Sequence, residues 1–144
     1  MKKRIVALTM IKLCTQVVDA QAGTTTPDKK VIETIIYEAA DQGLIGMTAV
    51  ACVIRNRAKE RDLTPLEVVT QPFQFSCWLK GANRWKYTAD TFRAAEQAWD
   101  LSKSFKLDSN LYYNPTLCLP SWANSPNVKK VCKVGQHIFM KEAR

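Results

Sequence analysis

The feature that most constrains the fold is a segment, from Met47 to Lys59, that is apolar on most sides of the helix it forms. Its apolar residues recur at helical spacing and make one wide face: Met47, Ala49, Val50, Ala51, Val53, Ile54 and Ala58. A helix of this kind has to be covered by other elements, because its exposure to water is unfavourable. In a chain of 144 residues, 47% of them hydrophobic, we predict one domain with this helix at its centre.

Three further helices are expected around this segment. The first has Thr26 as N-cap and Pro27 in its first turn, ends at Gly43, and buries apolar residues at helical spacing: Ile32, Ile35, Ile36 and Ala39. The capping box Thr64-Pro65-Leu66-Glu67 begins a short helix that ends by Gln71-Pro72. A third helix, over about 88–104, is expected to point four residues inward: Phe92, Ala95, Trp99 and Leu101.

The C-terminal third has a different pattern. Helical periodicity fades from Phe105 onward, and prolines interrupt the segment at Pro115, Pro120 and Pro126, which indicates loops. The stretch from Val131 to Phe139 fits a small hairpin that turns near Gly135. We therefore predict a mainly α fold of the α+β class with a minor β-hairpin.

The N-terminus resembles a secretion signal. A basic start is followed by a mostly apolar run to Cys14 and by Ala20-Gln21-Ala22, a small-residue cleavage pattern, although Lys12 and Asp19 fit a signal less well. We expect a signal peptide or N-terminal tail over 1–22, a linker and helix start over 23–30, and the functional domain over 31–144. No apolar run is long enough for a transmembrane span.

Charge and residue inventory exclude several function classes. The net charge of +8 favours anionic partners, but the basic residues are scattered, which argues against nucleic acid binding. His137 is the single histidine, and neither a metal-ligand motif, a G-x-S-x-G motif nor a glycine-rich phosphate loop occurs, so we expect no metal and no cofactor. A nucleophilic Cys77 or Cys52 paired with His137 stays open.

The cysteines allow two interpretations. Cleavage of the signal would remove Cys14 and leave an even number, which suits an oxidising compartment. A disulfide between Cys118 and Cys132 would then be the preferred pair, because it would staple the C-terminal loop. Buried free thiols are the alternative.

A carboxyl group at a helix edge is compatible with a role in catalysis, although a glutamate in such a position is most often a surface residue. Cleavage of a glycosidic bond needs a carboxylic acid that protonates the leaving oxygen, and a half-sheltered place favours such an acid. Glu38 lies about 110° from the centre of the buried face, beside Val31, whereas Asp41 lies nearly opposite and should be solvated. Two aromatic and polar segments could form the walls of a sugar groove: Phe73, Gln74, Phe75, Ser76 and Trp78; and Tyr112, Tyr113, Asn114 and Trp122.

Between about Val31 and Phe139 the chain resembles the SleB/CwlJ-type cell-wall hydrolase family of spore-cortex lytic enzymes, bacterial envelope enzymes and phages. Four blocks carry the resemblance, in this order: Glu38-Ala39 with Gly46 and Ala49-Val50-Ala51; Asn56-Arg57; Gln71-Pro72-Phe73-Gln74-Phe75-Ser76-Cys77-Trp78; and Pro120-Ser121-Trp122-Ala123 with Gly135-Gln136-His137-Ile138-Phe139. The resemblance implies a small lysozyme-like domain whose catalytic acid is Glu38. The family often has a second acid four positions later, where this chain has Gln42.

The resemblance implies cleavage of peptidoglycan between N-acetylmuramic acid and N-acetylglucosamine by a single glutamate. A lytic transglycosylase is preferred over a muramidase, although a distant Asp90 or Asp108 could fold into range as a second carboxylate. Supporting roles are expected for Asn56, Arg57 and His137, and sugar contacts for seven residues: Gln74, Phe75, Ser76, Trp78, Tyr112, Tyr113 and Trp122. We expect an exported or phage-encoded monomer that acts on the envelope. The alternatives are a Cys/His amidase or peptidase and a non-catalytic wall-binding module.

Overall fold

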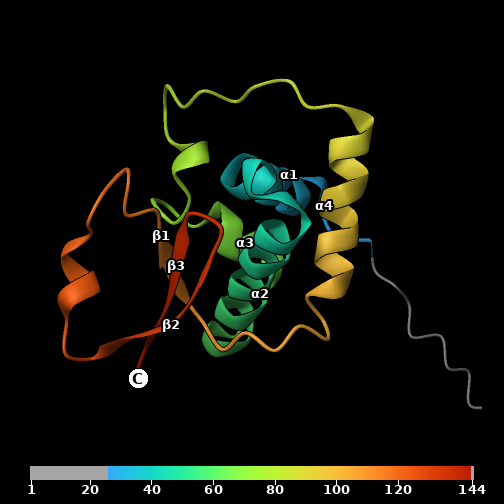
Figure 1. Ribbon diagram of the computed structural model, residues 1–144. Coiled ribbons are helices and arrows are strands. Elements are labelled where there is room, and N and C mark those ends of the chain that lie inside the picture. Colours follow the sequence, from blue (N-terminus) through green and yellow to red (C-terminus); the bar gives the residue numbers. More distant parts are fainter. Residues whose placement is uncertain (1–25, 144) are drawn as a thin grey trace, which may run out of the picture.

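Helix α2 (Gly43–Arg61) occupies the middle of the computed structural model, which describes residues 26–143 (Figure 1). It contacts three other helices: α1 (Lys29–Ala39), α3 (Pro65–Thr70) and α4 (Ala89–Leu101). Eleven of its residues are buried, Gly46 to Ile54 without a break and then Arg57 and Ala58. The central helix expected from the apolar segment is confirmed, and it begins earlier than expected, at Gly43. The proposed signal peptide over 1–22 lies outside the described residues.

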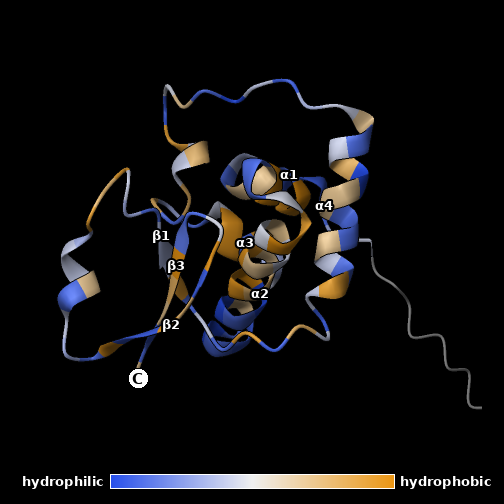
Figure 2. Cartoon of the chain, in the orientation of Figure 1, coloured by the Kyte–Doolittle hydropathy of each residue, from blue (hydrophilic) through white to orange (hydrophobic). Residues whose placement is uncertain are grey.

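The apolar residues gather where the helices meet. Figure 2 shows them concentrated on α2 and α3 in the middle of the molecule, while the last turns of α2 are hydrophilic. Ile32, Ile35 and Ile36 of α1 are buried against this centre, as their spacing predicted. None of the helices within residues 26–143 is both long and apolar enough to cross a membrane.

The ends of α1 differ from the expectation. Its N-cap is Asp28 rather than Thr26, because the Asp28 carboxylate accepts a hydrogen bond from the backbone N–H of Lys30 at 2.8 Å. Its regular turns end at Ala39, and a 3₁₀ turn (Ala40–Gln42) follows. Gly43, with φ of +69°, begins α2 instead of ending α1. The two helices therefore meet at a tight corner directly after Glu38.

The other two helices begin at their expected caps. Thr64 forms the capping box with Glu67 at the start of α3, and Thr88 caps α4 through its hydroxyl, which accepts from the backbone N–H of Thr91. On α4, Trp99 is buried. Leu101, which we expected to point inward, is 42% exposed because it lies off the face of α4 that carries the buried Ala95 and Trp99.

A three-stranded antiparallel sheet completes the fold, in the order β1-β3-β2. The expected hairpin is confirmed and extended: β2 (Val128–Val134) and β3 (His137–Glu142) are joined at Gly135. The third strand, β1 (Leu111–Tyr113), lies in a segment that we read as loop, and it pairs with β3 along the register Leu111↔Met140. Two further 3₁₀ turns occur, at Ser76–Trp78 and Ser121–Asn124.

The cysteines of the described part of the chain are free thiols. Cys52 and Cys77 are buried, in agreement with the free-thiol alternative. Cys118 is exposed and Cys132 is half-buried, and the disulfide that we preferred between them is not formed. The C-terminal loop is held by its hydrogen bonds and by packing of aromatic rings instead.

Candidate active site

A pocket of about 340 Å³ brings together residues from α1, α2, the loop after α3 and strand β1. The 3₁₀ turns Ser76–Trp78 and Ser121–Asn124 each contribute one more residue. Eight residues line it: Glu38, Arg57, Phe73, Gln74, Ser76, Leu111, Tyr112 and Trp122. Among these described lining residues, Glu38 carries the one carboxyl group. Segments as far apart in sequence as 38 and 122 therefore meet around this carboxyl.

Glu38 and Tyr112 form the central contact of the pocket. The Tyr112 hydroxyl donates a hydrogen bond to Glu38 Oε2 at 2.7 Å. Burial raises the pKa of Tyr112 well above its usual value, and the charge of Glu38 and this hydrogen bond raise the pKa further. The phenol therefore stays protonated and holds the half-buried carboxyl group of Glu38 in one orientation.

Tyr112 is itself fixed by aromatic packing on the sheet. Its ring stacks on Phe139 with centroids 5.5 Å apart and meets His137 edge-on at 5.2 Å. All three side chains come from the paired strands β1 and β3, so the sheet register sets the position of the Tyr112 hydroxyl. Tyr112 therefore contacts both Glu38 and His137, for which a sugar contact and a supporting role were expected.

Two further polar groups beside Glu38, the Cys77 thiol and the His137 imidazole, are neutral. Burial raises the pKa of the Cys77 thiol strongly, and the charge of Glu38 and a hydrogen bond to it add to this effect. Burial lowers the pKa of His137, against the opposing influence of Glu38 and Asp41. The neutral imidazole leaves Nδ1 buried and without a partner among the described residues.

Arg57 enters the pocket from α2 and is anchored through one nitrogen. Its Nε donates to the carbonyl oxygen of Asn110 at 2.7 Å, and its guanidinium carbon lies 5.3 Å from the ring centre of Phe75. The residue is 6% exposed, yet Nη1 finds no partner among the described residues. Burial lowers the pKa of Arg57, although not enough to remove its charge at neutral pH.

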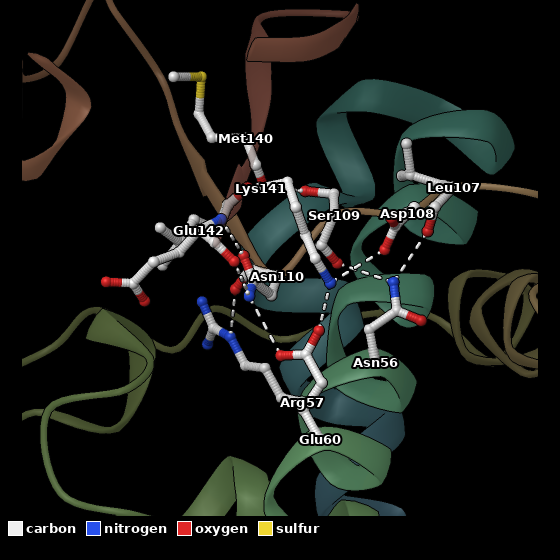
Figure 3. A network of polar contacts seen from close by, with 11 residues as sticks. Asn56, Arg57, Glu60, Leu107, Asp108, Ser109, Asn110, Met140, Lys141 and Glu142 are labelled. Atoms are coloured by element: carbon white, nitrogen blue, oxygen red, sulfur yellow. Dashed lines mark hydrogen bonds and ion pairs between the residues drawn. The ribbon is translucent and has the colours of Figure 1, made fainter. Parts of the chain in front are cut away.

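A network of polar contacts holds the segment before β1 against α2 (Figure 3). Asn110 Nδ2 donates to Glu60 at 3.1 Å, and its Oδ1 accepts from the backbone N–H of Glu142 at 2.9 Å. Lys141 of β3 pairs with both Glu60 and Asp108. This network joins α2, β1 and β3, and thereby sets the distance between Arg57 and Tyr112.

Asn56, which we expected to support the site, belongs to the same network rather than to the pocket. Its Nδ2 donates to the carbonyl oxygens of Leu107 and Ser109, each at 2.8 Å. It therefore fixes the loop between α4 and β1, as a polar residue near a helix end commonly does. Its influence on the pocket is indirect, through the placement of Tyr112.

Some residues of the two expected aromatic and polar walls line the Glu38 pocket, and others do not. Gln74, Ser76, Tyr112 and Trp122 line it, and Tyr113 packs edge-on against the Trp122 ring at 5.6 Å. Gln74 Oε1 accepts from Arg61 Nη1 at 2.9 Å, which holds that side chain in place. Leu111 is a pocket residue that sequence reasoning missed, since the strand that presents it was read as loop.

Phe75 and Trp78 lie outside the pocket lining. Phe75 is 3% exposed and packs in the core beneath Arg57. Trp78 donates from its indole nitrogen to Thr34 Oγ1 at 2.9 Å and meets the Tyr37 ring edge-on at 5.8 Å. Phe75 is therefore a structural support of the wall, whereas Trp78 is half-buried and lies beside the pocket.

The other acidic and amide candidates have partners elsewhere. Asp41 is exposed, as expected, and accepts a hydrogen bond from Gln42 Nε2 at 3.0 Å. Gln42 Oε1 accepts from the backbone N–H of Gln136 at 2.6 Å, which ties the corner after α1 to the β2–β3 turn. Asp90 pairs with Arg93 on the surface of α4.

A second cavity of about 370 Å³ lies near the start of α1. Arg55 is its main charged group, and this side chain is already engaged. It donates to Ser102 Oγ at 2.6 Å and to the Trp99 carbonyl at 3.0 Å, and it stacks over the Trp99 ring. The cavity thus offers fewer unpaired polar groups than the Glu38 pocket.

The fold is shared with two solved structures. The catalytic domain of the Bacillus cereus SleB protein matches with a TM-score of 0.61 and 22% identity, over 81% of this chain and 94% of that one. The catalytic domain of the germination-specific lytic transglycosylase SleB from Bacillus anthracis matches with a TM-score of 0.62 and 23% identity, over 83% and 98%. No curated protein sequence is significantly similar to the chain.

The family comparison covers most of the chain. The model of the cell wall hydrolase family matches residues 41–140, which begins directly after the Glu38 turn and includes α2, α3, α4 and nearly the whole sheet. The expected resemblance is confirmed, as is the α+β fold. Because this match spans more than half of its length, the chain belongs to the cell wall hydrolase family, and it is a peptidoglycan-degrading enzyme.

Proposed function

We propose that this enzyme cuts the glycan strand of peptidoglycan between N-acetylmuramic acid and N-acetylglucosamine, with Glu38 as its single acid and base. The observation that carries the proposal is the carboxyl of Glu38 in an open pocket, oriented by the Tyr112 hydroxyl at 2.7 Å. No other described lining residue of this pocket carries an acid of comparable strength.

The reaction uses the Glu38 carboxyl group twice, first as acid and then as base. Protonated Glu38 donates its proton to the bridging oxygen, the bond from that oxygen to C1 of muramic acid breaks, and an oxocarbenium-like state forms at C1. The Glu38 carboxylate then accepts the proton of the muramic 6-hydroxyl while that oxygen bonds to C1. The products are a 1,6-anhydromuramyl end and a free N-acetylglucosamine 4-hydroxyl, and no water is consumed.

The neighbours of Glu38 suit this cycle. Tyr112 stays protonated and can donate to Glu38 in its carboxylate form, which favours the return of the residue to the base role. The unpaired Nη1 of Arg57 is a buried donor at the pocket wall and is available to a carbonyl or carboxylate oxygen of the substrate. Gln74, Ser76 and Trp122 line the pocket, which supports a role in sugar contacts.

Transglycosylation is preferred over hydrolysis because a second carboxylate is needed in most hydrolytic mechanisms. Asp41 is exposed and bonded to Gln42, and Asp108 pairs with Lys141 at 2.9 Å in the network behind β1. Neither residue lines the pocket. The intramolecular hydroxyl of the muramic acid removes the need for an acid that positions water.

A Cys/His amidase is the main competing function. A nucleophilic cysteine needs a lowered pKa so that the thiolate forms. Burial instead raises the pKa of Cys52 to about 11 and that of Cys77 still further. Cys52 also donates to the carbonyls of Ser102 and Phe105, on the far side of α2 from the pocket. A thiolate is therefore disfavoured at both positions.

Digestion of purified sacculi, followed by mass spectrometry of the soluble products, tests the proposal. We expect muropeptides with 1,6-anhydromuramic ends. Reducing muramic ends would overturn the transglycosylase assignment and leave glycan cleavage in place. Free amines at the stem peptide, lost in a Cys77→Ala variant, would support the amidase, and tight binding without any soluble product would support a wall-binding module.

A further inference from the structure

Phe73 combines two properties that are costly for a phenylalanine. Its side chain is 86% exposed, and its φ of +61° places the backbone in the left-handed region. The residue is the third of a four-residue turn that is closed by a hydrogen bond from Gln74 N–H to the Gln71 carbonyl at 3.3 Å. With Pro72 in the second position, this turn has the form of a type II turn, whose third position favours glycine.

The turn is held in place by a neighbouring arginine. Arg61 Nη1 donates to Gln71 Oε1 at 2.6 Å and to Gln74 Oε1 at 2.9 Å, so it binds the turn on both sides of Phe73. The backbone strain is therefore maintained by contacts that do not involve the Phe73 ring. Since the exposed ring buries little surface, stability of the fold does not explain the choice of residue.

The position of the ring suggests an explanation. Phe73 lines the Glu38 pocket and also a second pocket of about 310 Å³. The second pocket is further lined by Gln71, Trp78, Lys30 and Lys80, and the Lys30 ammonium lies 4.5 Å from the centre of the Trp78 ring. Phe73 is thus shared between the candidate catalytic pocket and an adjoining pocket with two ammonium groups.

We propose that Phe73 is an aromatic platform on which a sugar of the glycan strand stacks as the strand passes from the Glu38 pocket into this second pocket. The second pocket is then a distal subsite for an N-acetylated amino sugar with an acidic stem peptide, whose carboxylates face Lys30 and Lys80. The strained backbone holds the ring upright against the strand. This inference rests on the proposed glycan-cleaving function.

Four variants separate the effect of the Phe73 ring from the effect of its strained backbone. Phe73→Tyr keeps an aromatic face, and Phe73→Leu keeps an apolar side chain of similar size without one. Phe73→Gly removes both the ring and the strain. Asp62→Gly is the matched control, because Asp62 also has a positive φ, of 53°, at the end of α2 and lines neither pocket.

We expect Phe73→Leu and Phe73→Gly to raise KM on purified glycan strands by about 5- to 10-fold, with kcat little changed, because a stacking contact is lost. The increase should be larger for long strands, which reach the second pocket, than for short fragments. Phe73→Tyr should retain the wild-type KM. Both glycine variants should raise Tm by about 2–4 °C through relief of the left-handed backbone, and Asp62→Gly should leave KM unchanged.

A wild-type KM in Phe73→Leu and Phe73→Gly, at every strand length, would overturn the platform. So would an equal loss in Phe73→Tyr, since that variant keeps the ring. Failure of the proposed function has a different signature, in which Glu38→Gln still cuts glycan strands. The two ideas can therefore fail separately.

Discussion

At the scale of single residues, the decisive contact is the hydrogen bond from Tyr112 to Glu38. Helix α1 carries a second glutamate with the same kind of contact: Glu33 Oε1 accepts a hydrogen bond from the Tyr87 hydroxyl at 2.5 Å. Glu33 does not line the Glu38 pocket. The two pairs share the tyrosine-to-glutamate hydrogen bond, although Glu33 also pairs with Lys29 at 3.5 Å, so the pair outside the pocket serves as the control.

Tyr112→Phe should lower kcat on peptidoglycan by roughly tenfold with little change in KM, because Glu38 loses the group that orients it. Tyr87→Phe removes the equivalent hydroxyl from Glu33 and should keep the wild-type kcat. Steady-state release of soluble muropeptides from sacculi measures both. Equal rates in the two variants would show that Tyr112 does not assist Glu38.

His137 should make the stability of the fold depend on pH. Burial lowers the pKa of native His137 below the 6.5 of the unfolded chain, so between these two values the unfolded chain binds a proton that the native protein does not. Stability from this residue is therefore complete above pH 6.5 and is lost as pH falls toward the native pKa. The Tm of the wild type should drop more between about pH 7 and pH 5 than that of His137→Asn. If Tm falls equally with pH in the wild type and in His137→Asn, His137 is not the source of the pH dependence.

At the scale of elements, the β2–β3 turn rests on the corner between α1 and α2. Gly135 has φ of +56°, and a Cβ placed there would lie 2.2 Å from Gln42 Oε1, the atom that accepts from the Gln136 N–H. Gly81 has φ of +80° with open space around its Cβ direction. The two glycines therefore separate backbone strain from contact with the corner.

Gly81→Ala should cost about 1 kcal/mol of unfolding free energy, from the left-handed backbone alone. Gly135→Ala should cost about 1 kcal/mol more, because Gln42 must give up its hydrogen bond. Urea denaturation measures both, and the extra cost should vanish in a Gln42→Ala background. If the two alanine variants are equally destabilised, the turn does not depend on Gln42.

The helices could be predicted from sequence because local signals specify them. The capping box at Thr64 and the apolar face of α2 act over a few residues, and both were confirmed. Strand β1 could not be predicted, since its three residues are extended only through pairing with β3, more than 20 positions away. The predicted N-cap of α1 was wrong by two residues, because Thr26 and Asp28 are both good caps and tertiary packing decides between them.

At the scale of the whole molecule, the fold converts scattered residues into one pocket. The sequence indicated Glu38, Gln74, Ser76, Tyr112 and Trp122, and the structure brings these five together. The sequence could not indicate that Phe75 is buried and that Trp78 lies outside the Glu38 pocket, because an aromatic residue suits a core and a sugar site equally well. The match to the cell wall hydrolase family begins at residue 41 and therefore does not include Glu38. The role of Glu38 is a matter for experiment.

The central claim is that the carboxyl of Glu38 supplies the proton for glycan cleavage. The most direct test is the cutting of purified glycan strands by Glu38→Gln, with Glu33→Gln as the matched control from the same helix. The account predicts that Glu38→Gln binds sacculi but releases fragments at least about 1,000-fold more slowly, while Glu33→Gln cuts at the wild-type rate. Wild-type cleavage by a folded Glu38→Gln protein would contradict it.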